Sequence, residues 1–418
     1  MNQIAQNKQG LKVLIAGAIL QLFLGIIYVW SVFVAPVRDY FGWDGGDVKL
    51  TASFMLCFYV IGILAGGKLQ MKIGVRLNAL IGGLMVAAGM LATAFIPKGK
   101  LTLEAALSSR MPFDGQLREA IAPVFLIYLF YGIIGGFGVG MGYNAAISTA
   151  QKWFPKNRGF ATGISVGAFG ASTVVFAPVV RALNSRFELN VVFMILAAVF
   201  AVATLALFSF IKTPEQVGGV TPPPLKGRQY TTREMLKSPR YYLIAASLML
   251  GTSVFFIVNP ALYDLATDRG LAGFATYLVM FTGIANAAGR LVVPMLSDKI
   301  GREHADIVIL GVTAAGAFGL CFAGGALLAV IIAAVAFCFG GYAGLYPVLT
   351  SENFGIKHIG ANYGAVMCGF MLSAMLFPIF INRIENQTVR FAVLGGLAVV
   401  GVVLVLALKK AKTKTMQK

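Results

Sequence analysis

The sequence predicts an all-α membrane protein with twelve transmembrane helices arranged in two lobes of six. The 418-residue chain is 58% hydrophobic and only 12% charged, with a mean hydropathy of +0.81. Such a mixture cannot form one water-soluble core with a solvated surface. Apolar runs of about 20 residues, the length that crosses a bilayer, recur from end to end. A polar, proline-rich segment divides these runs into two sets of six.

The predicted spans are 11–35, 50–71, 77–97, 121–149, 159–182, 189–211, 241–263, 272–296, 305–325, 327–350, 361–382 and 388–408. The first run is long, lacks a convincing small-residue cleavage site and precedes eleven others, so we expect it to stay as a helix and not to be removed as a signal peptide. The four cysteines all fall within spans, where we interpret them as small hydrophobic residues and not as disulfides or metal ligands.

The lysines and arginines predict the orientation. With an even number of spans both termini lie on one side, and the side richer in basic residues is cytoplasmic. Of the 34 Lys and Arg residues, 22 fall on the side of the termini and 11 on the other side. We therefore expect a multi-pass protein of the cytoplasmic (inner) membrane with both termini in the cytoplasm. The net charge of +18 fits this topology and contact with anionic membrane lipids, and it does not indicate nucleic-acid binding.

Arg290 is the one basic residue that belongs to neither side. It stands in the apolar run "GIANAAGRLVVPMLSDKIGR", nine residues before Lys299, which marks the cytoplasmic end of the span. At 1.5 Å per residue it lies roughly 13 Å into a hydrocarbon layer about 30 Å thick. A charge at this depth usually faces a bundle interior or a wet cavity and binds something. The alternative is a side chain that snorkels to the interface or pairs internally.

Weak internal similarity predicts a duplicated unit. "KIG" occurs at Lys72 and again at Lys299, and "QKWFPKNRGFATG" around Phe154 faintly matches "SENFGIKHIGANYG" around Phe354. The two copies in the second pair are separated by fewer residues than the two copies in the first pair, and the difference is about the length of the polar segment 98–120. We interpret this segment as an extracellular insertion. We therefore expect an N-terminal lobe over 1–211, a cytoplasmic linker over 212–240 and a C-terminal lobe over 241–418. A binding site then falls at the lobe interface near the membrane midplane.

The predicted site is centred on the span of Arg290. Asn286 lies four residues earlier and therefore on the same helical face. Arg290 could hold a carboxylate through two parallel hydrogen bonds, while Asn286 meets a hydroxyl or keto oxygen. The rest of the predicted cavity is aromatic, and its candidates are Tyr28, Tyr143, Tyr342, Tyr346 and Phe370. For each of these taken alone, packing is the more ordinary role.

Other kinds of site are not indicated. The glycine-rich stretch 132–142 lies inside a span and lacks a preceding strand, so we interpret Gly132, Gly136 and Gly140 as one packing face and not as a nucleotide-binding loop. Gly159, Gly163 and Gly167 repeat this spacing. We predict no metal site, no cofactor and no enzyme activity, because no metal-ligand cluster or catalytic pair is recognisable within the spans.

Two turns resemble a family signature. "GGKLQMKIGVR" (66–76) and "PMLSDKIGR" (294–302) are similar to the Gly-x-Leu-x-Asp-basic-x-Gly-basic loop of the major facilitator superfamily. In that family the aspartate and the arginines lock helix ends in one conformation. The resemblance therefore implies a conformational lock made of Asp298, Arg302 and Arg76. Met71 stands where the first copy should carry its aspartate, and Pro294 replaces a glycine in the second copy.

Longer stretches resemble a narrower group. "YVWSVFVAPVRDYFG" (28–42), "NAAISTAQKWFPKNRGFATG" (144–163), "GRLVVPMLSDKIGR" (289–302) and "GANYG" (360–364) are similar to the oxalate/formate antiporter family and to monocarboxylate (lactate) transporters of the same superfamily. This resemblance implies alternating-access transport of a small carboxylate, with Arg290 in the predicted span 272–296 as its counter-ion.

Two departures narrow the predicted substrate and coupling. The oxalate exchanger carries a second cation, a lysine, at the position where this sequence has Phe370 in the predicted span 361–382. A dianion would leave one carboxylate unpaired in a low-dielectric site, so we favour a monoanion. Animal lactate carriers have a proton-linked aspartate one turn before the arginine, where this sequence has Asn286. Asp264, at the outer end of the predicted span 241–263, is therefore the candidate for proton coupling, with an ordinary exposed aspartate as the alternative.

These observations together predict a monomeric secondary active transporter of small monocarboxylates such as lactate, pyruvate or formate, coupled to protons. Exchange (antiport) of oxalate with formate, or of another dicarboxylate, is the alternative within the same class. A membrane sensor that keeps the fold without transporting is the alternative from another class.

Overall fold

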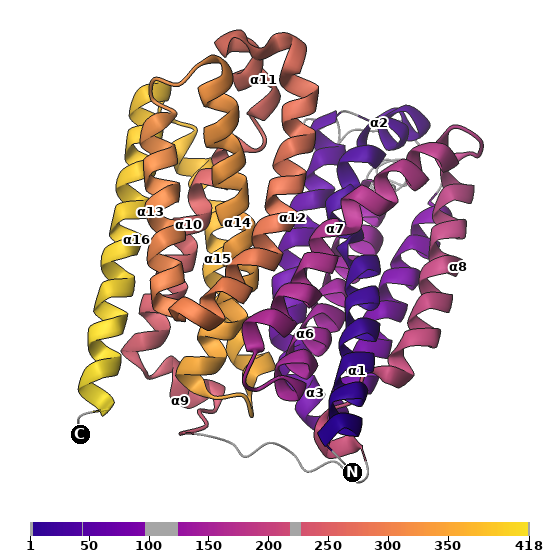
Figure 1. The fold of residues 1–418 in the computed structure, drawn as a ribbon. Helices are drawn as coiled ribbons and strands as arrows, with labels where there is room; N and C mark the ends of the chain where they lie inside the picture. Colours follow the sequence, from indigo (N-terminus) through magenta and orange to yellow (C-terminus); the bar gives the residue numbers. More distant parts are fainter. Residues whose placement is uncertain (1–2, 44, 97–123, 218–226, 417–418) are drawn as a thin grey trace, which may run out of the picture. The chain divides into compact units, whose positions relative to one another are not determined.

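The structure is a computed structural model that describes residues 3–43, 45–96, 124–217 and 227–416. Within these ranges the chain forms helices and the turns that join them, and it contains no β-strand (Figure 1). The predicted insertion 98–120 and the central part of the predicted linker lie outside the described residues. The all-α fold class is confirmed.

The first half contains α1 (Gln3–Leu24), η1 (Gly25–Val29), α2 (Trp30–Phe41), α3 (Gly45–Ala94), η2 (Tyr128–Gly135), α6 (Gly136–Trp153), α7 (Arg158–Asn184), α8 (Leu189–Leu207) and η3 (Phe208–Phe210). η1 and η3 are 3₁₀ turns, and η2 is a π-helical stretch that continues into α6. α1, η1 and α2 follow one another without a break and cover the first predicted span.

The second half contains η4 (Pro214–Gln216), α9 (Thr232–Leu236), α10 (Pro239–Val258), α11 (Leu262–Ala266), η5 (Thr267–Leu271), η6 (Ala272–Phe274), α12 (Ala275–Ile300), α13 (Arg302–Gly319), α14 (Gly325–Phe354), α15 (Ile359–Ile381) and α16 (Gln387–Met416). η4 and α9 belong to the predicted linker. Each begins with a capping box, at Thr213 and Thr231 respectively. In this motif the threonine side chain accepts a hydrogen bond from the backbone N–H three residues later, and the side chain of that later residue accepts one from the threonine N–H.

Both "KIG" turns have the same backbone. Gly74 interrupts α3 with φ 83° and ψ 159°, and Gly301 separates α12 from α13 with φ 91° and ψ 151°. This region of backbone space is essentially restricted to glycine. The chain therefore changes direction at equivalent points of its two halves, which is why two predicted spans, 50–71 and 77–97, share the single element α3.

Ten segments of the described chain are long and apolar enough to cross a membrane. One of them, Leu50–Ala94, has 45 residues and contains the two spans that meet at Gly74. The predicted span 305–325 corresponds to α13, which has 18 residues and begins with the polar residues Arg302, Glu303 and Asp306. The prediction of twelve transmembrane helices is therefore consistent with the helices present.

The chain divides into two compact units that we describe separately. Unit 1 comprises Met1–Leu14, Ile147–Gly170 and Thr213–Lys418, and unit 2 comprises Ile15–Ala146 and Ala171–Lys212. The predicted boundaries of the two lobes and the linker stay a prediction. α7 is shared, because its first half up to Gly170 belongs to unit 1 and its second half to unit 2.

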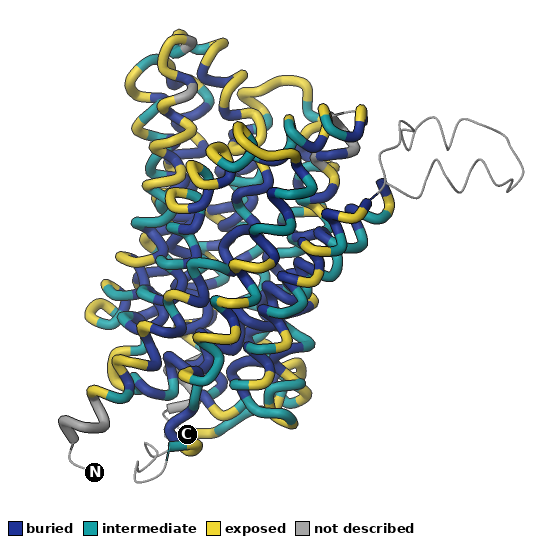
Figure 2. The backbone as a smooth tube through the Cα atoms, turned by 90° about the vertical axis from the view of Figure 1, so that its right-hand side faces the viewer, coloured by how far each residue is buried: buried dark blue, intermediate teal, exposed yellow. Residues whose placement is uncertain are grey.

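The surfaces of the helices are strongly apolar. Large hydrophobic side chains are widely exposed, among them Phe322 at 78%, Val202 at 67% and Met280 at 61%. Figure 2 shows buried and exposed positions alternating along the helices. Exposed apolar surface on this scale is unusual for a water-soluble protein and indicates a multi-pass membrane protein.

Glycine faces bring helices of unit 2 into backbone contact, as the spacing predicts. A Cβ atom on Gly136 would lie 2.5 Å from the carbonyl oxygen of Met55, and one on Gly140 would lie 2.1 Å from that of Tyr59. These distances leave no room for any side chain, so only glycine allows this approach of α6 to α3.

Candidate functional site

Arg290 is buried in the middle of α12. Only 1% of the residue is exposed, and it is among the largest fully buried side chains in the described chain. A buried guanidinium remains charged, because arginine does not lose its proton in proteins. Arg290, which was predicted to lie deep in the span before Lys299, is therefore an enclosed cation and does not snorkel to the surface of the described structure.

Asn286 is the first polar neighbour of Arg290. The Nε–H of Arg290 donates to Asn286 Oδ1 at 2.9 Å, one helical turn away on the same face. The bond holds the side chain along the helix and orients the guanidinium plane. The structure therefore brings together the two central residues of the predicted site.

α7 forms a wall beside this arginine. The Arg290 guanidinium carbon lies 5.8 Å from the ring centre of Phe169, a cation–π distance. A Cβ atom on the next residue, Gly170, would lie 2.6 Å from Arg290 Cδ and 3.0 Å from Nε. Gly170 therefore provides the space that the arginine side chain occupies. Sequence reasoning missed both residues, although the glycine spacing of 159, 163 and 167 could have indicated this helix face.

The same face of α7 packs closely on α12. A Cβ on Gly159 would lie 1.8 Å from the carbonyl oxygen of Pro294, and one on Gly163 would lie 2.8 Å from that of Leu291. The packing role predicted for these glycines is confirmed. Sliding of this interface during transport stays a prediction.

α14 also packs closely on α12. Cβ atoms on Gly340 and Gly344 would lie 1.9 Å from the Asn286 carbonyl oxygen and 2.7 Å from the Arg290 carbonyl oxygen. Tyr342 and Tyr346 are fully buried on the same helix and direct their hydroxyls to other helices. The Tyr342 hydroxyl lies 2.9 Å from Thr313 Oγ1 on α13.

The Tyr346 hydroxyl lies 3.1 Å from Asp306 Oδ2 on α13 and 2.9 Å from Ser247 Oγ on α10. Sequence reasoning did not single out Asp306. The signal that could have found it is an acidic residue just inside the predicted span 305–325.

Phe370 belongs to an aromatic cluster. Its ring centre lies 5.1 Å from that of Phe256 and 5.9 Å from that of Phe339, and the residue is 5% exposed. Phe339 also stacks on Phe255 at 3.9 Å. The position that resembles a lysine site in the oxalate exchanger is therefore enclosed by apolar rings.

Tyr28 and Tyr143 belong to unit 2. Tyr28 is half-buried in η1. Tyr143 is buried in α6, with its ring 5.3 Å from that of Tyr59 in an edge-to-face arrangement. Their predicted place in a cavity with Arg290 stays a prediction.

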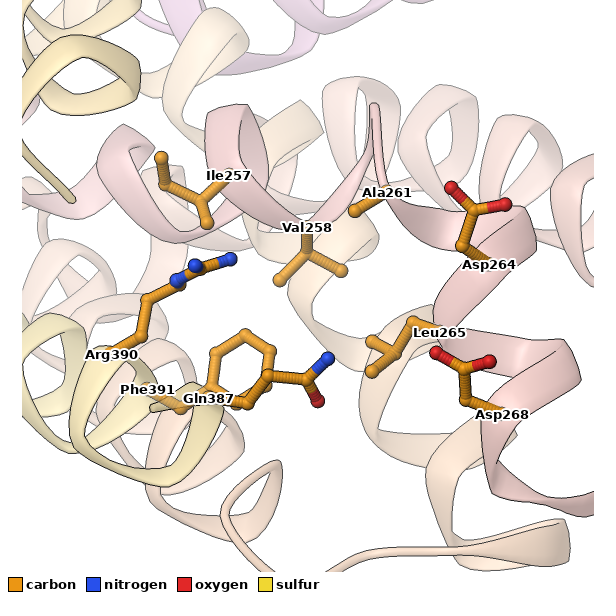
Figure 3. A pocket seen from close by; sticks show the side chains of 9 residues that line it. All are labelled: Ile257, Val258, Ala261, Asp264, Leu265, Asp268, Gln387, Arg390 and Phe391. Atoms are coloured by element: carbon orange, nitrogen blue, oxygen red, sulfur yellow. The ribbon is translucent and has the colours of Figure 1, made fainter. Parts of the chain in front are cut away.

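Asp264 lies on α11 and is exposed. It lines a small cavity of about 60 Å³ together with Asp268, Gln387, Arg390 and apolar side chains of α10, α11 and α16 (Figure 3). Because Asp264 is exposed, its position fits the alternative of an ordinary surface aspartate, and its role in proton coupling stays a prediction.

The half-buried Asp298 and the buried Arg302 form an ion pair where α12 ends and α13 begins. The Arg302 Nη2 group donates to Asp298 Oδ1, and Arg302 Nε lies 3.4 Å from Glu352 Oε2 at the end of α14. Asp298 also accepts the backbone N–H groups of Gly159 at 3.0 Å and Phe160 at 2.8 Å. These are the first N–H groups of α7, where the helix dipole favours a negative charge.

This cluster therefore links four helix ends of unit 1. Arg158 adds a further link, because its Nη1 donates to the carbonyl oxygen of Ser351 at 3.4 Å. Arg76, the third residue of the predicted lock, lies in unit 2 with its guanidinium carbon 5.1 Å from the ring centre of Phe208. The structure brings together Asp298 and Arg302, and the locking function of all three residues stays a prediction.

The family follows from sequence and fold together. A model of the Major Facilitator Superfamily matches residues 14–378, so the chain belongs to this superfamily. The structure of the proton:xylose symporter XylE bound to 6-bromo-6-deoxy-D-glucose has the same fold, with a TM-score of 0.68 over 96% of each chain at 15% sequence identity. The chain is a membrane transporter of this superfamily and not an enzyme.

Two relatives are carriers of small carboxylates by name. The oxalate:formate antiporter of Oxalobacter formigenes is 25% identical over 347 residues, which cover 81% of this chain and 76% of that protein. Monocarboxylate transporter 11 of Homo sapiens is 23% identical over 289 residues, which cover 68% of this chain and 55% of that protein. The resemblance to antiporter and monocarboxylate families stated from the motifs is thus confirmed.

Proposed function

We propose that the protein is a secondary active transporter of small monocarboxylates, of the lactate, pyruvate or formate type, that works by alternating access with proton coupling. The observation that carries the proposal is the buried Arg290, held by Asn286 and flanked by Phe169. The names of the two carboxylate carriers among its relatives support the substrate class.

Charge explains why this site suits a carboxylate. An arginine at the centre of a membrane helix costs at least about 2.5–3.5 kcal/mol on insertion scales. A bound carboxylate cancels that charge and accepts two parallel hydrogen bonds from the planar guanidinium. Asn286 can present its amide to a hydroxyl or keto oxygen next to the carboxylate. The site thus discriminates by charge first and by the neighbouring oxygen second.

The surroundings of Phe370 favour a monoanion over a dianion. Phe256 and Phe339 enclose this position, so it offers a second carboxylate neither a cation nor a hydrogen-bond donor. An unpaired carboxylate in apolar surroundings is costly. We therefore place lactate, pyruvate and formate before oxalate.

The proposed cycle uses the α7–α12 interface. With the site empty, closing it over the positive charge of Arg290 is unfavourable, and a bound carboxylate removes this penalty. Asp298 and Arg302 stabilise the conformation in which the start of α7 contacts the end of α12. In this proposal the termini face the cytoplasm, the protein lies in the inner membrane as a monomer, and Arg76 contributes to the lock of the other half.

The test is transport by the purified protein in liposomes. We would measure uptake of labelled lactate, pyruvate, formate and oxalate, with and without an inward proton gradient, for wild type and Arg290→Ala. The matched control is Arg38→Ala, since Arg38 is exposed and pairs only with its neighbour Asp39 among the described residues. We expect monocarboxylate uptake that falls at least 100-fold in Arg290→Ala and stays near wild type in Arg38→Ala.

Each other outcome has a defined meaning. Uptake of lactate or pyruvate at the wild-type rate by well-expressed Arg290→Ala would refute the role of this arginine. Oxalate uptake that requires internal formate would assign the protein to the exchanger class and would mean that a dianion finds a second partner elsewhere. Binding without accumulation of any of the four anions would favour a sensor.

A further inference from the structure

Asp306 is a buried acid that the proposed carboxylate site does not use. It lies on the second turn of α13 and is fully enclosed, with 0% of the residue exposed. Its Oδ2 atom lies 3.1 Å from the Tyr346 hydroxyl of α14, which in turn lies 2.9 Å from Ser247 Oγ on α10. The carboxyl group therefore sits where three helices of unit 1 meet.

The hydrogen bonds around Asp306 can be counted proton by proton. Ser247 Oγ donates to the carbonyl oxygen of Ile244 at 3.0 Å, so its single proton is used. In the contact between Tyr346 and Ser247, the hydroxyl of Tyr346 must then donate its own proton to Ser247 Oγ. The remaining contact, between Tyr346 and Asp306, needs a third proton, and only the carboxyl group can supply it. All three contacts are satisfied together only when Asp306 is protonated.

The surroundings offer an ionised Asp306 little compensation. Its Oδ1 atom is buried and has no hydrogen-bond partner, and the ion pairs of the described chain do not include this residue. The titratable groups that face it are Tyr346 and Tyr342 on α14 and Glu303 on its own helix, while α10 presents the neutral Ser247. Burying a carboxylate without a cation is costly, and taking up a proton removes the cost.

We infer that Asp306 is the proton-binding site of the transporter. The inference rests on the proposed function, because Asp306 carries the proton that accompanies the transported carboxylate. A proton from water forms an O–H bond on Oδ2 and brings the charge of Asp306 from −1 to 0. Release on the other side of the membrane breaks this bond and restores the carboxylate. One carboxylate and one proton then cross together without net charge.

α14 connects this site to Arg290. On one face, Gly340 and Gly344 bring the backbone of α14 against that of α12 at Asn286 and Arg290. On another face Tyr346 contacts Asp306. A carboxylate that binds without a proton would leave Asp306 ionised. The doubly loaded protein avoids this penalty, and α14, which contacts both sites, can therefore couple the two fluxes.

This assignment differs from the sequence-based candidate Asp264. Asp264 is exposed beside a small cavity, whereas Asp306 is enclosed and hydrogen-bonded to two helices through Tyr346. The two aspartates therefore provide matched variants, Asp306→Asn and Asp264→Asn, with the same chemical change at a buried and an exposed position.

The first experiment separates proton coupling from carboxylate movement. Proteoliposomes that contain a pH-sensitive dye report the acidification driven by added lactate, and labelled lactate reports exchange against internal lactate. We expect Asp306→Asn to exchange within about twofold of wild type while its lactate-driven acidification falls at least tenfold. Asp264→Asn should keep both, and Arg290→Ala should lose both.

These readouts distinguish the two proposals. Exchange that persists in Arg290→Ala, or no exchange in wild type, contradicts the proposed carboxylate function. Normal exchange in wild type with acidification that persists in Asp306→Asn, or that disappears in Asp264→Asn instead, overturns the assignment of Asp306. Wild-type exchange without any proton flux overturns it as well.

A second variant keeps the test decisive if Asp306→Asn does not fold. In Ser247→Ala, Tyr346 has no competing acceptor and donates to the ionised carboxylate, so the midpoint pH of lactate uptake should fall by roughly half a pH unit to one unit, the equivalent of one hydrogen bond. Thr313→Ala is the matched control, because Thr313 joins Tyr342 to the carbonyl oxygen of Ile309 without any acid. An unchanged or raised midpoint in Ser247→Ala would overturn the assignment.

Discussion

Gly170→Ala is the sharpest single test of how the structure positions the carboxylate site. The added methyl group would lie 2.6 Å from Arg290 Cδ, whereas ordinary contacts between such atoms are 3.4–4 Å. Either the arginine or α7 must therefore move by roughly 1 Å, and a misplacement of this size can cost on the order of 100-fold in rate. We expect carboxylate uptake to fall between tenfold and 100-fold.

The assay is initial uptake of lactate or pyruvate in proteoliposomes, over a range of substrate concentrations. Gly167→Ala is the matched control, because it lies one turn earlier on α7 and its added Cβ would lie 3.4 Å from Leu291 Cβ. Both variants should melt within a few degrees of wild type in detergent, since the change is one methyl group. Equal uptake by Gly170→Ala and Gly167→Ala would show that α7 does not position Arg290.

Three further predictions concern the helix ends. Asp298→Ala removes the acceptor of two N–H groups of α7 and the partner of Arg302, so thermal unfolding in detergent should show a loss of about 1–3 kcal/mol; Lys299→Ala, which changes an exposed neighbour, should show no such loss. Gly301→Ala forces a side chain into φ 91° and should cost about 1–3 kcal/mol, whereas Gly311→Ala, with open space in mid-helix, should not destabilise. The backbone and side chain of Thr231, with Arg228, lower the pKa of Glu234 to about 2, so the charge of Glu234 contributes above pH 4.5 and is lost only as the pH falls through about 2. Glu234→Gln should therefore leave the pH profile of uptake unchanged between pH 5 and pH 8, and a shifted profile would contradict this reasoning.

Much of the fold could be predicted because it depends on local properties of the chain. A run of about 20 apolar residues forms a helix in a membrane whatever its neighbours are, since its backbone groups have no other partners there. The interruption at Gly74 and Gly301 was visible as a repeated "KIG" turn. The distribution of lysine and arginine residues between the two sides predicts the orientation of the chain in the membrane, and this orientation stays a prediction.

The centre of the site was also predictable, because its two residues share one helix. Asn286 and Arg290 are four positions apart, and helical geometry alone puts their side chains in contact. Asp298 and Arg302 have the same spacing and form a pair across the glycine turn. By contrast, the prediction that Tyr342 and Tyr346 face the carboxylate is still open, since their hydroxyls contact α13 and α10.

The sequence by itself determined the membrane class, the helices and the buried charge at Arg290, because hydrophobic length and the 3.6-residue period are encoded locally. Only the tertiary structure decided what surrounds that charge. Phe169 and Gly170 stand more than 100 residues before Arg290, and Asp306 meets Tyr346 and Ser247 from two other helices. Which helix faces meet depends on how side chains and glycines interlock across the bundle, and no local pattern specifies that choice.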